Sequence, residues 1–147
     1  KHSSSFNSQI KTFKDKAFVI DMENQLRCFS LETGDLIWSV KTQQSLLRSQ
    51  KKQTLILIND KVYFTNWNSK DVKILNLTTY AIESSIPIEG LPEDIITDGI
   101  NLWVSIPNLE LNDPSDGTKV VKINLESERL LYPKDKSLKI VSFLPFI

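Results

Sequence analysis

The sequence predicts an all-β fold, and three observations support that prediction. Short runs rich in β-branched and aromatic residues recur along the chain, such as Lys16 to Ile20 and Val62 to Thr65, and turn-like segments separate them. No apolar stripe of helical period extends beyond two turns. The chain has 147 residues, of which 40% are hydrophobic, so it is long enough to bury a core.

The predicted strands fall into groups along the chain. The first group has strands at 16–20, 25–30 and 35–40. Two groups of four follow, at 54–58, 62–65, 72–76 and 82–86, and then at 94–97, 101–105, 120–124 and 129–132. A last run, Leu138 to Phe143, looks like the opening strand of another group.

A short motif repeats with these groups. Ser30, Asn76 and Asn124 are each followed by Leu and, three positions on, by a hydroxyl residue, and they are spaced by 46 and 48 residues. A period in the forties with four strands per unit is typical of β-propeller blades. We expect the polar side chain and the hydroxyl to bond the turn backbone, and Gly34 to supply a positive φ.

The repeat divides the chain into blades. We expect one propeller segment over 1–147, with four-stranded antiparallel blades at about 9–41, 53–88 and 92–133, and the start of the next blade at 138–147. Closed propellers have roughly four to eight blades. The sequence therefore predicts a partial or open propeller, completed by further blades in cis, by homo-oligomerisation or by a protein partner.

The segment Cys28 to Trp38 resembles the pyrroloquinoline-quinone-type (PQQ-like) propeller repeat. Thr33, Gly34 and Trp38 match the Thr, Gly and Trp of that repeat, while Ser30 stands where the family usually has Asp. The resemblance implies that Trp38 packs between adjacent blades, a role that suits a flat aromatic side chain.

The later copies depart from this pattern. Tyr80 and Glu128 stand in place of the Gly, and Ser84 and Tyr132 in place of the Trp. Instead, Val62 to Asn66 is similar to the Tyr-Val-Thr-Asn (YVTN) propeller repeat, and the likeness continues through 71–74, 85–92, 94–99 and 102–105. Both motifs are structural, so they imply a propeller more strongly than any function.

The resemblance to PQQ-like propellers of envelope protein assembly implies a non-enzymatic scaffold for protein–protein interaction in a periplasmic or secreted setting. Two alternatives stay open: a fragment of a PQQ-dependent quinoprotein oxidoreductase, and a secreted YVTN-type module that binds a surface glycan or protein. Quinoproteins hold a quinone and calcium on the propeller axis, in some members beside a disulfide of adjacent cysteines. Cys28 is the single cysteine, and we expect no cofactor.

Charge and hydropathy restrict the partners. Lys and Arg number 18, as do Asp and Glu, and this balance argues against broad electrostatic binding to nucleic acid or to an anionic membrane. The longest purely aliphatic stretch is Leu55 to Ile58, far short of the ~18 residues that a spanning helix needs. We therefore expect a protein partner and no membrane span.

Trp67 is the best candidate for a partner contact. It lies in the predicted turn Asn66 to Ser69, where an indole has little core to enter, whereas we expect Trp38 and Trp103 to pack in a core or between blades.

Other chemistry has weaker support. Asp113 and Asp116 offer oxygen ligands for a cation such as calcium, but the loop lacks a closing Glu and is typical of an exposed turn. No catalytic residue is expected, because the one His is His2, near the N-terminal end.

Overall fold

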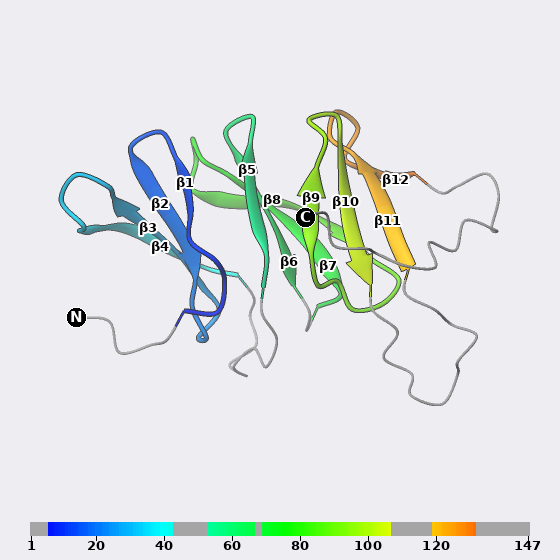
Figure 1. Ribbon diagram of the computed structural model, residues 1–147, viewed down its shortest axis with the longest axis horizontal. Coiled ribbons are helices and arrows are strands. Elements are labelled where there is room, and N and C mark those ends of the chain that lie inside the picture. Colours follow the sequence, from blue (N-terminus) through cyan, green and yellow to red (C-terminus); the bar gives the residue numbers. More distant parts are fainter. Residues whose placement is uncertain (1–5, 43–52, 67–68, 107–118, 132–147) are drawn as a thin grey trace, which may run out of the picture.

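The computed structural model describes residues 6–42, 53–66, 69–106 and 119–131, and these residues form three four-stranded antiparallel sheets (Figure 1). Each sheet is a meander of consecutive strands. Blade 1 contains β1 (Lys11–Phe13), β2 (Lys16–Ile20), β3 (Gln25–Ser30) and β4 (Leu36–Lys41). Blade 2 contains β5 (Leu55–Ile58), β6 (Lys61–Asn66), β7 (Asp71–Asn76) and β8 (Ala81–Pro87). Blade 3 contains β9 (Ile95–Thr97), β10 (Asn101–Ile106), β11 (Lys119–Asn124) and β12 (Arg129–Leu131).

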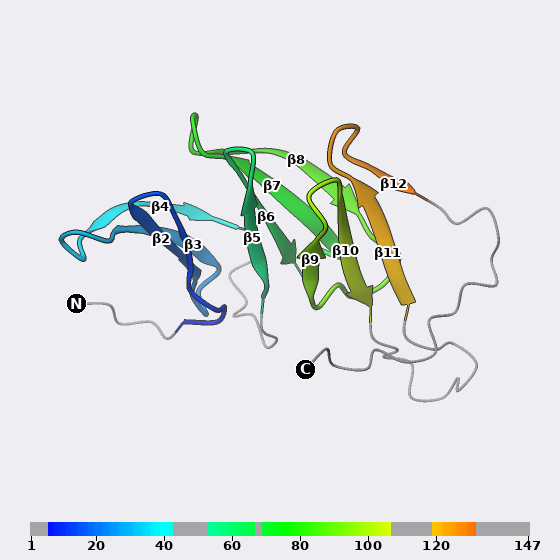
Figure 2. The same cartoon turned by 45° about the horizontal axis from the view of Figure 1, so that its top comes forward.

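The described sheets are arranged as a fan. Strand β1 contacts β5, and β5 contacts β9, so the first strands of the sheets stand side by side. The fourth strands, β4, β8 and β12, lie on the opposite side of the fan (Figure 2). This is the arrangement of propeller blades around an axis. The predicted all-β fold with four-stranded antiparallel blades is confirmed, and among the described residues no helix is long and apolar enough to cross a membrane.

The apolar cores lie between the blades. One core joins blades 1 and 2 through Phe18, Ile20, Leu26, Cys28, Leu55, Val62, Phe64 and Leu75. The other joins blades 2 and 3 through Tyr63, Val72, Ile74, Ile86, Ile88, Ile95, Leu102, Val104, Ile106 and Ile123. Blade 2 is therefore covered on both faces, which explains why the five consecutive residues of β6 from Val62 to Asn66 are all buried.

Neighbouring strands place equivalent residues on the same face of each blade. We call the face that looks toward the next blade in the sequence the forward face, and the other the backward face. On blade 1 the forward face carries the cross-strand row Lys11, Phe18, Cys28 and Trp38. On blade 2 the equivalent row is Ile56, Tyr63, Ile74 and Ser84. These rows contribute most of their residues to the interblade cores.

The turn between the third and fourth strands has the same hydrogen bond in every described blade. Counted from the last residue of the third strand as the first, the fifth residue has a positive φ. This fifth residue donates its N–H to the carbonyl of that last strand residue. The pairs are Gly34 (φ 76°) with Ser30 at 2.9 Å, Tyr80 (φ 56°) with Asn76 at 2.8 Å, and Glu128 (φ 54°) with Asn124 at 2.8 Å. The sequence motif spaced by 46 and 48 residues thus marks one recurring turn.

The structure adds a strand that the sequence analysis did not predict. Strand β1 has only three residues, Lys-Thr-Phe, of which one is β-branched, so its sequence signal is weak. It pairs with β2, and Phe13 packs against the core between blades 1 and 2. The expected start of a further blade at 138–147 lies outside the described residues.

Candidate interaction sites

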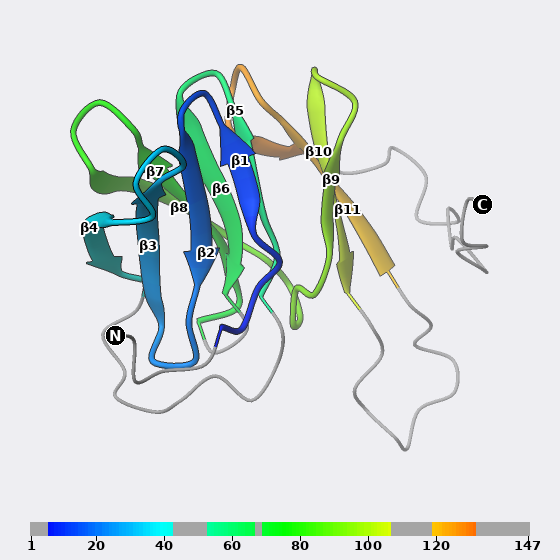
Figure 3. The same cartoon turned by 60° about the vertical axis from the view of Figure 1, so that its left-hand side comes forward.

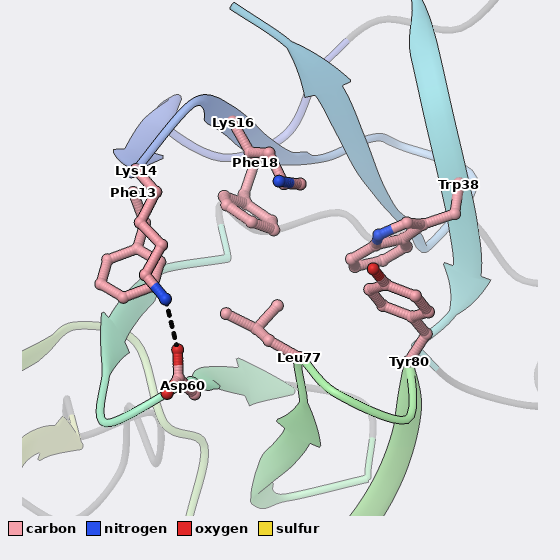
Figure 4. A pocket seen from close by; sticks show the side chains of 8 residues that line it. All are labelled: Phe13, Lys14, Lys16, Phe18, Trp38, Asp60, Leu77 and Tyr80. Carbon is pink, nitrogen blue, oxygen red and sulfur yellow. Dashed lines mark hydrogen bonds and ion pairs between the residues drawn. The ribbon is translucent and has the colours of Figure 1, made fainter.

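Trp38 lies at the junction of blades 1 and 2. It comes from β4 on the forward face of blade 1, where its indole packs 6.0 Å from the Phe18 ring, centroid to centroid. Its other neighbour is Tyr80 in the β7–β8 turn of blade 2, at 5.1 Å (Figure 4). The indole Nε1 is buried and has no hydrogen-bond partner in the described part of the chain. Trp38 therefore joins the two blades through apolar packing and ring contacts.

A small cavity of about 110 Å³ lies beside this aromatic contact. Its lining is Phe13, Lys14, Lys16, Phe18, Trp38, Asp60, Leu77 and Tyr80, from both blades (Figure 4). The Lys14 Nζ and Asp60 Oδ1 atoms pair across it at 3.2 Å, but both side chains are exposed and such pairs stabilise little. Small-molecule pockets usually measure about 300–1,000 Å³. The cavity is thus a blade junction and too small for a typical ligand.

The equivalent junction of blades 2 and 3 is polar. Lys61 Nζ donates to Glu128 Oε1 at 2.7 Å and pairs with Glu83 Oε1 at 2.6 Å, and Ser84 Oγ donates to Glu128 Oε2 at 3.3 Å. The pKa of the Lys61 amine is raised well above its usual value, by Glu128 most and then by Glu83. The hydrogen bond from Lys61 in turn lowers the pKa of the Glu83 carboxyl. Glu128 occupies the turn position that Tyr80 occupies in blade 2.

Polar groups also gather beside the first strands of blades 2 and 3. Thr54 Oγ1 lies 3.0 Å from the Glu93 carbonyl oxygen and 3.1 Å from Asp94 Oδ1, so its hydroxyl can donate to either. The Gln53 side chain is 2% exposed, and within the described ranges neither its Oε1 nor its Nε2 has a hydrogen-bond partner. With Gln9 and Leu55 these residues line a cavity of about 240 Å³. Gln53 and Thr54 could not be singled out from the sequence, because their meeting with Glu93 and Asp94 depends on how the blades are placed.

The backward face of blade 1 carries an open apolar groove of about 330 Å³. Its lining is Phe6, Ile10, Ala17, Val19, Phe29, Ser30, Leu31 and Gly34. Three of these side chains are largely exposed: Phe6 at 47%, Ile10 at 59% and Leu31 at 51%. Figure 3 looks toward this end of the molecule, where β1, β2 and β3 stand side by side. The only sequence signal for the groove is a pair of apolar residues, Phe6 and Ile10, in the otherwise polar segment before β1. This signal was too weak to predict the groove.

The structure places some of the predicted site residues and not others. Thr33 and Gly34 lie in the β3–β4 turn, where the Thr33 N–H donates to Ser30 Oγ at 3.2 Å and Thr33 Oγ1 accepts the Asp35 N–H at 3.3 Å. Trp67, Asp113 and Asp116 lie outside the described residues, as does Tyr132. In the described ranges, no group of three His, Cys, Asp or Glu side chains could hold a metal ion.

Trp103 lies on the forward face of blade 3. It points away from blade 2 and is not part of the core between blades 2 and 3. Its indole Nε1 donates to Asp98 Oδ2 at 3.3 Å, and Lys122 Nζ lies 4.9 Å from its ring centroid. The alternation of β10 explains this placement, because Leu102 and Val104 take the face that packs against blade 2.

Comparison with known proteins supports the fold and gives no family. No family model matches the chain, and no curated protein sequence matches it. Among solved structures, the computationally designed protein Ika4 is similar with a TM-score of 0.67 and 13% identity, covering 92% of this chain and 75% of that chain.

Two natural proteins are also similar. Hydrazine synthase of Kuenenia stuttgartiensis has a TM-score of 0.66 and 15% identity, covering 92% of this chain and 38% of that chain. BamB of Moraxella catarrhalis has a TM-score of 0.62 and 12% identity, covering 89% of this chain and 38% of that chain. At such identities the likeness shows the β-propeller fold alone. The chain spans less than two fifths of the length of either protein.

Proposed function

We propose that this chain is a non-enzymatic β-propeller scaffold for protein–protein interaction, and that the backward face of blade 1 binds a β-sheet blade of a protein partner. The apolar groove on that face carries the proposal. It exposes Phe6, Ile10 and Leu31 over a sheet face whose counterpart on blade 2 is buried against blade 1. Contiguous exposed apolar surface rimmed by polar residues is characteristic of interaction sites.

The use of charged side chains supports a structural role. Arg27 Nε donates to the fully buried Asp21, and Lys73 Nζ donates to Asp71 Oδ2 at 2.9 Å. Lys61 joins two blades through Glu128. These groups stabilise strands, turns and blade junctions by pairing with one another. The resemblance of 28–38 to the PQQ-like repeat of scaffold propellers points in the same direction.

A position-specific cross-link tests the proposal. A photoreactive amino acid at position 10 lies in the groove, and one at position 100 is the matched control, because Ile100 is an exposed Ile outside the groove. In the cells that make the protein, we expect a protein adduct from position 10 alone. The adduct should disappear when Leu31→Glu adds a charge to the groove, and its cross-linked peptide should map to a β-strand.

Two results would overturn the proposal. Equal adduct yields from positions 10 and 100 would show that the groove has no preference for protein. An adduct that survives Leu31→Glu would show that the cross-link does not report on the groove.

A further inference from the structure

A polar cavity lies where the segments that lead into β1, β5 and β9 meet. These three strands stand side by side in the described fold (Figure 1). The cavity measures about 240 Å³, and each blade contributes polar residues from just before its first strand: Gln9 from blade 1, Gln53 and Thr54 from blade 2, and Glu93 and Asp94 from blade 3. It shares no lining residue with the apolar groove on the backward face of blade 1. A ligand in this cavity therefore goes beyond the proposed scaffold function.

Gln53 lies at the buried end of the cavity. It is 2% exposed, whereas Gln9 and Asp94 are exposed and lie at the mouth. In the part of the chain that the structure describes, neither Oε1 nor Nε2 of Gln53 has a hydrogen-bond partner. Buried amides almost always have partners, because an unpaired donor or acceptor has lost its hydrogen bonds to water without replacement. Gln53 therefore offers an acceptor and an N–H donor to a molecule inside the cavity.

The mouth of the cavity carries negative charge. Asp94 Oδ1 lies 3.1 Å from Thr54 Oγ1, and Glu93 places a second carboxylate beside Asp94. No Lys, Arg or His lines the cavity, and within the described ranges neither carboxylate forms an ion pair. The amine of Lys11 donates to Gln9 Oε1 at 3.4 Å and to neither carboxylate. The charge at the mouth therefore favours a cationic ligand.

Hydrogen bonds fix the backbone that carries these groups. The Glu93 N–H donates to the Ser105 carbonyl at 3.0 Å, and the Asp94 N–H donates to Ser105 Oγ at 3.1 Å. Thr65 Oγ1 accepts the Thr54 N–H at 3.1 Å and lies 3.3 Å from the Glu93 carbonyl oxygen. Segments that are already ordered lose little conformational entropy when a ligand binds.

The donors and acceptors of the cavity select the class of ligand. A metal ion would use the oxygens but leave the Nε2 donor of Gln53 unpaired, and a neutral diol would bring no charge to Asp94. A primary ammonium group can donate both to the Asp94 carboxylate and to Gln53 Oε1. An oxygen two bonds along the ligand can then accept from Gln53 Nε2.

We infer that this cavity binds a small primary amine with a hydroxyl or carbonyl oxygen on the carbon next to the one that bears the amine. Its ammonium group pairs with Asp94 at the mouth, and its oxygen faces the buried amide of Gln53. Leu55, which is 1% exposed, provides apolar surface for the carbon atoms. The volume is below the roughly 300–1,000 Å³ of pockets for drug-sized ligands, so it suits a molecule of a few non-hydrogen atoms.

Three probes of equal size test the inference: 2-aminoethanol, propylamine and ethylene glycol. Propylamine lacks the oxygen, and ethylene glycol lacks the charge. The NMR signals of the Gln53 side-chain amide, assigned by their loss in Gln53→Leu, report binding at constant ionic strength. We expect a dissociation constant on the order of 1 mM for 2-aminoethanol and values at least about tenfold higher for the other two probes.

Substitutions test the two ends of the cavity. Asp94→Asn should raise the dissociation constant of 2-aminoethanol at least about tenfold, because it removes the charge at the mouth. Asp35→Asn is the matched control and should leave it unchanged, since Asp35 is an exposed Asp that does not line the cavity. Gln53→Leu should abolish the shift of the Thr54 backbone signal without lowering the melting temperature, because it replaces unpaired polar atoms with apolar ones.

Several results would overturn the inference. If 2-aminoethanol leaves the Gln53 signals unchanged, solvent alone pairs with this amide. Equal binding of propylamine would show that the oxygen plays no part, and equal binding of ethylene glycol would show the same for the charge. A shift with calcium chloride and none with 2-aminoethanol would assign the cavity to a metal ion. A fall in the melting temperature of Gln53→Leu would show that the amide stabilises the fold and is not held for a ligand.

Discussion

The ring centroids of Trp38 and Tyr80 lie 5.1 Å apart with 42° between the ring planes, and this contact joins β4 of blade 1 to the β7–β8 turn of blade 2. Tyr80 holds a φ of 56°, a left-handed conformation that costs a residue with a Cβ about 1–2 kcal/mol. Gly34 occupies the same turn position in blade 1 without that cost. Tyr80 therefore adopts a strained backbone conformation and places its ring against Trp38 of the neighbouring blade.

Replacement of Trp38 tests the contact. We expect Trp38→Ala to lower the free energy of unfolding by about 3 kcal/mol, since a large side chain at a blade junction is lost. Trp38→Phe should cost less, because it keeps a ring against Tyr80 and removes a buried N–H that has no hydrogen-bond partner in the described ranges. Urea denaturation measures both, and equal losses for Ala and Phe would contradict this account.

Two glycine substitutions at positions of nearly equal φ separate strain from packing. Lys70 has a φ of 55° and an exposed side chain, so Lys70→Gly should stabilise the protein by at most about 1 kcal/mol, as strain relief exceeds the entropy lost. Tyr80→Gly relieves similar strain but removes the ring from Trp38, and we expect a net loss of about 1 kcal/mol. Urea midpoints that shift in the same direction for both variants would argue against this explanation of Tyr80.

Asp98 should contribute stability that disappears in acid. Its Oδ1 accepts the N–H groups of Asn101 at 2.7 Å and Ile100 at 2.9 Å, and these bonds hold the pKa of the carboxyl well below its usual 3.8. A carboxyl whose pKa is lower in the folded protein stabilises the fold at a pH above its pKa in the unfolded chain. This stability is lost as the pH falls through its pKa in the folded protein. Asp98→Asn should therefore flatten the decline in melting temperature below about pH 4. A decline as steep as that of the wild type would exclude Asp98 as a source of it.

Cys28 should be inert in the folded protein. It lies in the core between blades 1 and 2, and burial raises the pKa of its thiol to about 11 from 9.0. A thiol reagent should modify it only as fast as the protein opens, because the thiolate is the reactive form. Rapid labelling at neutral pH without denaturant would contradict this burial.

The same thiol links stability to alkaline pH. The pKa of the thiol is about 11 in the folded protein and 9.0 in the unfolded chain. Its contribution to the free energy of unfolding is therefore fully present below pH 9.0 and is lost as the pH rises through about 11. Cys28→Ala should remove this part of the alkaline decline in the free energy of unfolding, measured between about pH 8 and pH 11. An unchanged pH dependence would assign the whole decline to other groups.

The fold could be predicted because its signals are local. Strands such as β2 and β6 are rich in β-branched and aromatic residues, and the repeat of Ser30, Asn76 and Asn124 marks the same turn in successive blades. Strand β1 was missed because three residues with one β-branched side chain give little pattern.

The contacts between blades could not be predicted in the same way. The sequence shows that Tyr80 and Glu128 replace Gly, but not that their side chains meet Trp38 and Ser84 of the preceding blade. Those pairs are more than 40 residues apart, and only the strand register and the packing of one sheet on another bring them together. The groove on blade 1 depends on the same register, since it determines which face Val19 and Phe29 occupy.

The division of the core between neighbouring sheets has a consequence for folding. No apolar cluster among the described residues belongs to one blade, so each sheet gains its stability from the sheet beside it. Free energy in such an array is a sum of nearest-neighbour couplings, and among the three described sheets only blade 2 packs on a described sheet with both faces. Amide protons of β6 and β7 should accordingly be the slowest to exchange with solvent among those of the described strands.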